Sequence, residues 1–197
     1  MSEKKSEKIQ DFDAMKEKIV LAAFSLAESQ GWQHTNLRDI ASEAEIALVD
    51  CYALFDDKND ILVHFNRMID RQVLAGVADD SLASSRETLF DLMMDRYEAL
   101  NAHRAGLVAI LDSMKCDPKQ VLISVPHLCR SMGWMLEVAG VDTSGVRGAI
   151  KVAGLSGLYL KVLKVWVDDD GADLPKTMSA LDKALGKAED WAGMFGL

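Results

Sequence analysis

Apolar residues recur at helical intervals along most of the chain. One stripe lies between Asp11 and Gln30, where Gly31 then ends the predicted helix. Its members are Phe12, Met15, Ile19, Ala23 and Leu26. The same spacing predicts further helices over residues 37–44, 48–54, 57–73, 88–100, 118–140, 146–167 and from Pro175 onward. Because no stretch of any length alternates apolar and polar positions and the chain contains only three prolines, the sequence predicts an all-α protein.

Two short helices in the N-terminal third are joined by a tight turn. Asn36 is placed to cap the first of them, and Asp39 stands at its third position, where a carboxylate favours the positive end of the helix dipole. Asp57 is placed to cap the helix that follows. The residues expected in the shared core are Leu37, Ile40, Ala41, Ala44, Ile46, Cys51, Tyr52 and Phe55. This layout predicts a helix-turn-helix unit, whose second helix normally enters the DNA major groove.

A specific residue pattern runs through this unit. It consists of Leu37-Arg38-Asp39-Ile40-Ala41, then Ala44, Ile46, Tyr52, Phe55, Lys58 and Leu62. The pattern resembles the N-terminal signature of TetR-family transcriptional regulators. The resemblance implies a helix-turn-helix domain over residues 1–56 and a helical ligand-binding and dimerisation domain over residues 57–197.

The TetR resemblance also implies a DNA-binding surface and a strained turn. Four residues are expected to hold phosphates, namely Asn36, Arg38, Tyr52 and Lys58. Three are expected near base edges, namely Ala47, Leu48 and Asp50, where Asp50 would accept from a cytosine amine and Leu48 would contact a thymine methyl. Family members usually carry glycine where this chain has Glu45, so the turn is expected at positive φ, at a cost of about 1 kcal/mol.

The charge of the unit opposes DNA binding, which rests largely on neutralising phosphates with Lys and Arg. From His34 to Leu62 there are seven acidic residues and only two basic ones, Arg38 and Lys58, a net charge of minus five. The N-terminal residues Lys4, Lys5 and Lys8 could form a basic arm, but Glu3 and Glu7 dilute it, and a solvated disordered tail is the preferred interpretation.

Composition narrows the class of protein further. The net charge of −9 over 197 residues gives no general attraction to nucleic acid or anionic membranes, and the N-terminus has no apolar leader. We therefore expect a cytoplasmic protein. Three distant cysteines, Cys51, Cys116 and Cys129, show no zinc-type spacing and are expected to be buried thiols. No nucleophile–base spacing, phosphate loop or metal-ligand cluster is present, so we expect neither an enzyme nor a cofactor, and residues 168–170 are interpreted as a solvated helix end.

Pro126 interrupts the predicted helix over residues 118–140 and should kink it. Soft apolar and aromatic residues gather near it and on the preceding helix. They are Met93, Met94, Tyr97, His127, Met132, Trp134 and Met135. Such adaptable side chains suit a pocket for a small apolar ligand, and an ordinary core is an equally good alternative.

The helix over residues 146–167 is apolar on two sides, which suggests that one side faces a second chain. Together with the last helix it would form a four-helix interface, as in TetR-like regulators, which implies a homodimer. The interface residues expected are Gly154, Gly157, Leu160, Leu163, Val167, Leu181 and Leu185.

A second, looser resemblance lies in the C-terminal half. Its residues are Arg130, Trp134, Ala139-Gly140, Asp142, Ser144, Tyr159, Trp166, Asp169, Asp173, Thr177 and Leu181-Asp182. They are similar to the coenzyme Q biosynthesis accessory proteins, which are built on the TetR fold yet bind isoprenoid lipid rather than DNA. In that family a C-terminal amphipathic helix touches the membrane; the candidates here are Trp191, Met194, Phe195 and Leu197.

Two functions therefore remain after the sequence is considered. The favoured one is a dimeric TetR-like regulator, a repressor released from its operator by a small apolar ligand. The alternative is a lipid-binding accessory protein that no longer binds DNA. Membrane attraction is expected to be weak, because Lys183 and Lys187 are balanced by Glu189 and Asp190.

Overall fold

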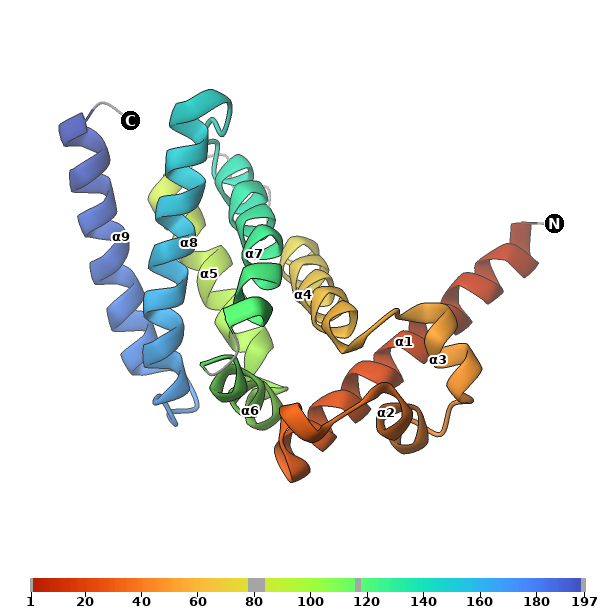
Figure 1. Ribbon diagram of the computed structural model, residues 1–197. Coiled ribbons are helices and arrows are strands. Elements are labelled where there is room, and N and C mark those ends of the chain that lie inside the picture. Colours follow the sequence, from red (N-terminus) through yellow and green to blue (C-terminus); the bar gives the residue numbers. More distant parts are fainter. Residues whose placement is uncertain (1, 78–83, 116–117, 196–197) are drawn as a thin grey trace. The chain divides into compact units, whose positions relative to one another are not determined.

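The computed structural model describes residues 2–77, 84–115 and 118–195, and the side chains of residues 12–77, 84–115 and 122–190. Within these ranges all the regular elements are helices, which confirms the predicted all-α class (Figure 1). Several predictions concern side chains outside the described residues. They are those on Lys4, Lys5, Lys8, Cys116, Trp191, Met194, Phe195 and Leu197.

The chain divides into two compact units. Unit 1 comprises Met1–Met68 and His103–Ser124, and unit 2 comprises Ile69–Ala102 and Val125–Leu197. Two helices contribute residues to both units, α4 (Lys58–Ala75) and α7 (Pro118–Val138).

Unit 1 is built on α1 (Ser2–Gln30), against which α2 (Leu37–Glu43) and α6 (Arg104–Met114) pack. A short 3₁₀ helix, η1 (Trp32–His34), follows α1, and α3 (Leu48–Leu54) follows α2. Gly106 lets α6 approach α1 closely, since a Cβ at this position would lie 2.5 Å from the carbonyl oxygen of Phe24 in α1. Trp32, in η1, is buried in the core with 1% of its surface exposed.

The first helix starts earlier than the apolar stripe indicated. It begins at Ser2 rather than near Asp11, and the segment interpreted as a disordered tail is helical. Residues 2–10 carry mainly Lys, Glu and Ser. Lys and Glu have high intrinsic helix propensity, so a stretch of this composition can extend a helix that packing has already nucleated.

Unit 2 contains α5 (Ser85–Asn101), α8 (Gly145–Val167) and α9 (Pro175–Phe195), with the C-terminal parts of α4 and α7. Helices α8 and α9 form an antiparallel pair joined by a short turn, and α5 contacts both (Figure 1). The core of unit 2 includes Trp166 and Tyr159, both at most 5% exposed. In the described part of the chain, no helix is long and apolar enough to cross a membrane.

The turn between α8 and α9 corrects one prediction. Residues 168–170 were expected to be a solvated helix end, but Asp169 is only 1% exposed. Its Oδ2 accepts hydrogen bonds from the backbone N–H of Thr177 at 2.7 Å and from the Thr177 hydroxyl at 2.8 Å. Burial opposes ionisation of this carboxylate, but the hydrogen bonds from Thr177 outweigh it and lower the pKa of Asp169. Asp169 thus caps the first turn of α9 from outside that helix.

Candidate functional site

The start of α2 is fixed by a reciprocal capping arrangement. The side-chain oxygen of Asn36 accepts hydrogen bonds from the N–H groups of Arg38 and Asp39 at 3.0 and 3.1 Å. In return, the N–H of Asn36 donates to the Asp39 carboxylate at 3.4 Å. Both residues were predicted to act here, and the structure confirms the cap. Arg38, which lies between these two residues in the sequence, is exposed.

The turn between α2 and α3 has the backbone conformation expected from the TetR resemblance. Glu45 has a φ of 55°, in the left-handed region where glycine carries no penalty. Its side chain is exposed. The turn is closed by the N–H of Ile46, which donates to the carbonyl of Ala41 at 2.9 Å.

Helix α3 has a buried side and an exposed side. Cys51 and Phe55 are buried, and burial raises the pKa of the Cys51 thiol. Tyr52 was expected to share this core, but it is 55% exposed, because its position in the helical period points it away from Cys51. Its place on the outward face agrees with the phosphate-contacting role implied by the resemblance.

The exposed residues of α3 and its N-cap form one set, which we call the α3 face. It consists of Ala47, Leu48, Val49, Asp50, Tyr52 and Ala53. Val49 is the residue that sequence reasoning missed. At 74% exposure it shares with Leu122 the highest value among the large apolar side chains described in unit 1. The sequence could have shown this exposure, because Val49 lies two positions before the buried Cys51 and so on the other side of the helix. The α3 face contains one acid and no Lys or Arg.

Lys58, at the start of α4, is held by the backbone of unit 1. Its ammonium donates to the carbonyl oxygens of Trp32 at 2.6 Å and Thr35 at 3.0 Å. It also lies 4.9 Å from the centroid of the Trp32 ring, within cation–π range. The helix itself is capped by Asp57, whose side chain accepts from the N–H groups of Asn59 and Asp60, as predicted. Through these hydrogen bonds, Lys58 links the start of α4 to η1 and to the residue that follows it.

Most of the residues expected to line a ligand pocket are fully packed within unit 2. Five of them are at most 5% exposed, namely Met93, Met94, Tyr97, Met132 and Met135. The Tyr97 hydroxyl donates to the carbonyl of Tyr159 at 2.9 Å, and the two rings stack with centroids 5.3 Å apart. Burial, together with Tyr159, raises the pKa of Tyr97 well above its usual value. This packing favours the ordinary-core alternative for the five.

Two further pocket candidates lie on α7 and are only partly buried. The indole N–H of Trp134 is buried and has no hydrogen-bond partner among the described residues. His127 is half-buried, and its carbonyl accepts from the Ser131 hydroxyl at 3.2 Å. Cys129, expected to be buried, is half-buried, and the Ser156 hydroxyl lies 3.6 Å from its sulfur. Trp134 is thus the pocket candidate with an unsatisfied polar group.

A buried charged cluster in unit 2 was not foreseen. Arg96 on α5 is 2% exposed and pairs with the carboxylate of Asp70 on α4. The other oxygen of Asp70 accepts from the Ser131 hydroxyl on α7 at 2.7 Å. The Arg96 guanidinium also lies 5.5 Å from the centroid of the Tyr159 ring. Burial disfavours the Arg96 cation, but Tyr159 and Asp70 more than offset this, so its pKa is raised. The cluster joins three helices of unit 2.

The seven residues expected at a dimer interface differ in how exposed they are. Leu163, Leu181 and Leu185 are buried by the protomer's own helices, so their side chains belong to its core rather than to a surface that a second chain can reach. Gly154 and Gly157 are exposed, and a Cβ at either position would meet nothing within 4 Å. The remaining two are Leu160, which is exposed, and Val167, which is half-buried.

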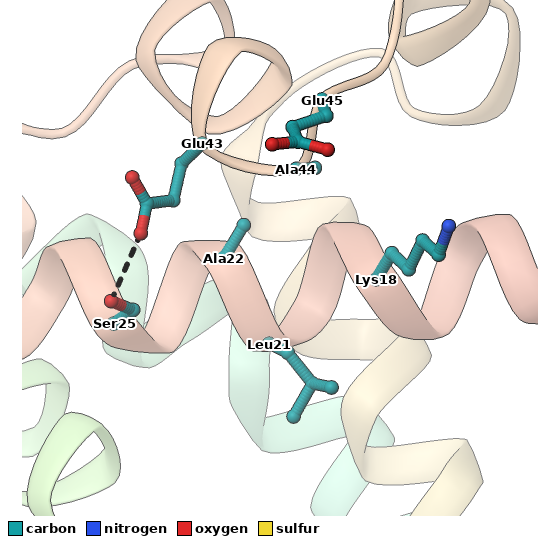
Figure 2. Close-up of a pocket in the computed structure, with 7 residues that line it drawn as sticks. All are labelled: Lys18, Leu21, Ala22, Ser25, Glu43, Ala44 and Glu45. Carbon is teal, nitrogen blue, oxygen red and sulfur yellow. Dashed lines mark hydrogen bonds between the residues drawn. The ribbon is translucent and has the colours of Figure 1, made fainter.

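Unit 1 also contains a shallow pocket of about 340 Å³ between α1 and the turn after α2, which we call the outer groove (Figure 2). Its lining is Lys18, Leu21, Ala22, Ser25, Glu43, Ala44 and Glu45. In Figure 2, Ala22 points from α1 toward Ala44 on the opposite wall. The Ser25 hydroxyl donates to the Glu43 carboxylate at 3.3 Å across one end of the groove.

Comparison with known proteins extends over nearly the whole chain. No family model matches the sequence. No curated protein matches it either. Among solved structures, a TetR transcriptional regulator from Nitrosomonas europaea ATCC 19718 is similar with a TM-score of 0.72 at 22% identity, covering 89% of this chain and 98% of that one. A TetR transcriptional regulator from Rhodococcus sp. RHA1 gives a TM-score of 0.63 at 17% identity, covering 89% of this chain and 96% of that one.

A third solved structure has a bound ligand. It is FadR from Thermus thermophilus, a TetR-family transcriptional repressor in complex with lauroyl-CoA, with a TM-score of 0.57 at 18% identity, covering 87% of this chain and 91% of that one. Each of the three similarities covers at least 87% of this chain. The chain thus has the fold of TetR-family transcriptional regulators.

Proposed function

We propose that this protein is a transcriptional repressor that binds operator DNA as a homodimer and is released by a small apolar ligand. The observation that carries the proposal is the helix-turn-helix itself, in which α3 is anchored by Cys51 and Phe55 and presents the α3 face to solvent. In this arrangement Ala47, Leu48 and Asp50 would approach base edges. Arg38 and Tyr52 would contact phosphates, with Asn36 holding the start of α2 in place.

Lys58 would contribute to DNA binding in a different way from Arg38. Since its ammonium already donates to the carbonyls of Trp32 and Thr35, its first role is to position the start of α4. A phosphate contact by Lys58 would have to be made alongside these bonds. Arg38 is therefore the cleaner test of the DNA interface.

The test is fluorescence anisotropy of the purified protein with duplex DNA from upstream of its own gene, at low and at physiological salt. Binding tighter than to an unrelated duplex, and weakening with salt, is the expected result. Arg38→Ala should weaken binding to both duplexes alike and flatten the salt dependence. The matched control is Arg130→Ala, which removes the same charge from an exposed position of unit 2. If Arg38→Ala and the unmodified protein bind DNA with equal affinity, Arg38 does not contact DNA.

Dimerisation through α8 is supported by a row of exposed apolar and small residues along that helix. Its members are Val146, Ile150, Ala153, Gly154, Gly157 and Leu160, of which Val146 is 79% exposed. Gly157→Arg adds a long charged side chain where the protomer leaves open space, so the protomer should fold normally while the dimer dissociates. Light scattering after size-exclusion chromatography measures the oligomeric state. A variant that stays dimeric would show that the interface does not include Gly157.

The ligand-release part of the proposal is supported by the fold shared with the lauroyl-CoA complex of FadR and by the unsatisfied indole N–H of Trp134. A fatty acyl chain with a polar end is the probe of choice. Trp134→Ala should weaken its binding without unfolding the protein, and Trp166→Ala, in the core of the same unit, serves as the contrast that should unfold it. Unaltered affinity in Trp134→Ala would show that Trp134 does not contact the ligand.

A second candidate function is supported by one observation on the α3 face. This face carries no Lys or Arg, and the nearby Lys58 is tied to backbone carbonyls. Such a surface suits a lipid-binding accessory protein that has kept the fold without the DNA contacts. Absence of DNA binding even at low salt and without ligand, combined with uptake of an isoprenoid lipid, would favour this alternative over the repressor.

A further inference from the structure

Val49 projects from the side of α3 that lies opposite the core of unit 1. Successive residues of a helix are about 100° apart, which places Val49 about 160° around the axis from the buried Cys51, and Leu48 only about 60° from it. The exposures follow this order, at 74% for Val49 and 38% for Leu48. Val49 is therefore the first large apolar side chain that a partner approaching this side of the helix reaches.

The neighbours of Val49 on the α3 face leave its side chain prominent. Ala53 follows four positions later, on the same line along the helix, and its side chain is a single methyl group. Asp50 and Tyr52 lie on the two flanks of this line, and both are exposed. The line of closest approach is thus apolar, with a carboxylate on one side and a phenol on the other.

The chemistry of the α3 face limits which bases its side chains can read. Guanine presents two acceptors in the major groove, and the usual contact to them is a bidentate Arg or Lys, which this face lacks. Adenine is usually read by Asn or Gln, and the face lacks these as well. Thymine presents a C5-methyl group that an apolar side chain can contact, and cytosine presents an amine that can donate to a carboxylate. Val49 and Asp50 suit these last two bases.

We propose that Val49 is a specificity-determining residue of the DNA interface and that it recognises the C5-methyl group of a thymine in the major groove. This inference rests on the DNA binding proposed above and names the base that Val49 selects. It adds to that interface a residue that the sequence pattern did not assign, and it makes Val49, rather than Leu48, the main apolar contact. The operator then has an A·T pair at this position of each half-site.

Deoxyuridine is the matched probe, because it pairs as thymidine does and lacks only the methyl group. The duplex from upstream of the protein's own gene is amplified once with dTTP and once with dUTP, and an unrelated duplex is prepared in the same two forms. Fluorescence anisotropy with the full chain at physiological salt measures the four affinities. The uracil form of the upstream duplex should bind about four- to fifteenfold more weakly than the thymine form, the size expected for losing one buried methyl contact in one or both half-sites. The two forms of the unrelated duplex should bind alike.

Val49→Ala tests whether this loss of affinity acts through Val49. The substitution shortens an exposed side chain, so the variant should fold normally, which circular dichroism checks. It should bind the thymine form of the upstream duplex more weakly than the unmodified protein does, and it should discriminate less than about twofold between the thymine and uracil forms. The matched control is Val125→Ala, which shortens a valine that is 41% exposed in unit 2 and should keep the full discrimination.

The outcomes separate this inference from the proposed function. If the thymine form of the upstream duplex binds no more tightly than the unrelated duplex, the proposed function fails and this inference fails with it. Specific binding that is equally tight with thymine and with uracil would overturn this inference alone. So would the same loss on uracil substitution in Val49→Ala and in the unmodified protein, because the methyl group would then act through another residue or through the shape of the DNA.

Discussion

Replacing Asp70 with asparagine should destabilise unit 2 by about 3 kcal/mol. Arg96 cannot lose its proton in a protein, so Asp70→Asn leaves a cation that is 2% exposed without its ion-pair partner. Breaking a buried pair costs about 3–5 kcal/mol, whereas surface pairs contribute about 0–1. The Asp70 side chain is 15% exposed, which places the cost at the lower end of the buried range.

The free energy of unfolding is measured by urea denaturation, with hydrogen exchange of the α5 and α7 amides to localise the effect. For a chain of this length, a loss of about 3 kcal/mol should lower Tm by about 6–12 °C. The control is Asp91→Asn on the exposed side of α5, which should change stability by no more than about 0.5 kcal/mol. Adding Arg96→Met to Asp70→Asn should recover part of the loss, because it removes the uncompensated charge.

A loss of less than about 1 kcal/mol for Asp70→Asn would refute this reasoning, because it would mean that the cluster behaves like a surface ion pair. A further loss on adding Arg96→Met would also contradict it. That result would show that Arg96 stabilises the protein mainly through Tyr159 and its aliphatic packing.

Three other substitutions test separate features. Gly106→Ala should destabilise unit 1 by about 1–3 kcal/mol in thermal unfolding, since the new methyl group would lie 2.5 Å from the backbone of Phe24; unchanged stability would mean that α6 can move away. The folded-state pKa of Asp169 is lowered, so its contribution to stability is present above the unfolded pKa and is lost as pH falls through the folded value. Asp169→Asn should remove this acid dependence and weaken the bonds from Thr177; an unaltered pH profile would contradict it. Burial lowers the pKa of His103, which should make stability fall as pH drops below about 6.5, and His103→Phe should flatten that decline.

The sequence predicts the local parts of the fold well because short-range chemistry determines them. The caps at Asn36 and Asp57 involve residues two or three positions apart, so they can be recognised from the residue types alone. The positive φ of Glu45 was expected from the TetR resemblance, because members of that family usually carry glycine at this position of the turn. The observed bounds of α3, Leu48–Leu54, also agree with the prediction from the sequence.

Contacts between distant residues could not be foreseen in the same way. Arg96 and Asp70 lie 26 positions apart, and each has the residue type of an exposed position. Asp169 reaches Thr177 across the turn, where three consecutive aspartates resemble a solvated loop. Within α3, the helical period alone shows that Tyr52 points away from Cys51, and the error there came from treating every large apolar residue as core.

In α3, the residues that anchor the helix to the core lie on one side, and the residues exposed to solvent lie on the other. Cys51 and Phe55 face inward and secure the helix, while the outward positions, Val49 and Tyr52 among them, contribute little to the core. Mutations on the outward side can therefore accumulate, or be engineered, without a large cost in folding. A change of binding partner therefore requires only new outward side chains, while the scaffold beneath them remains the same.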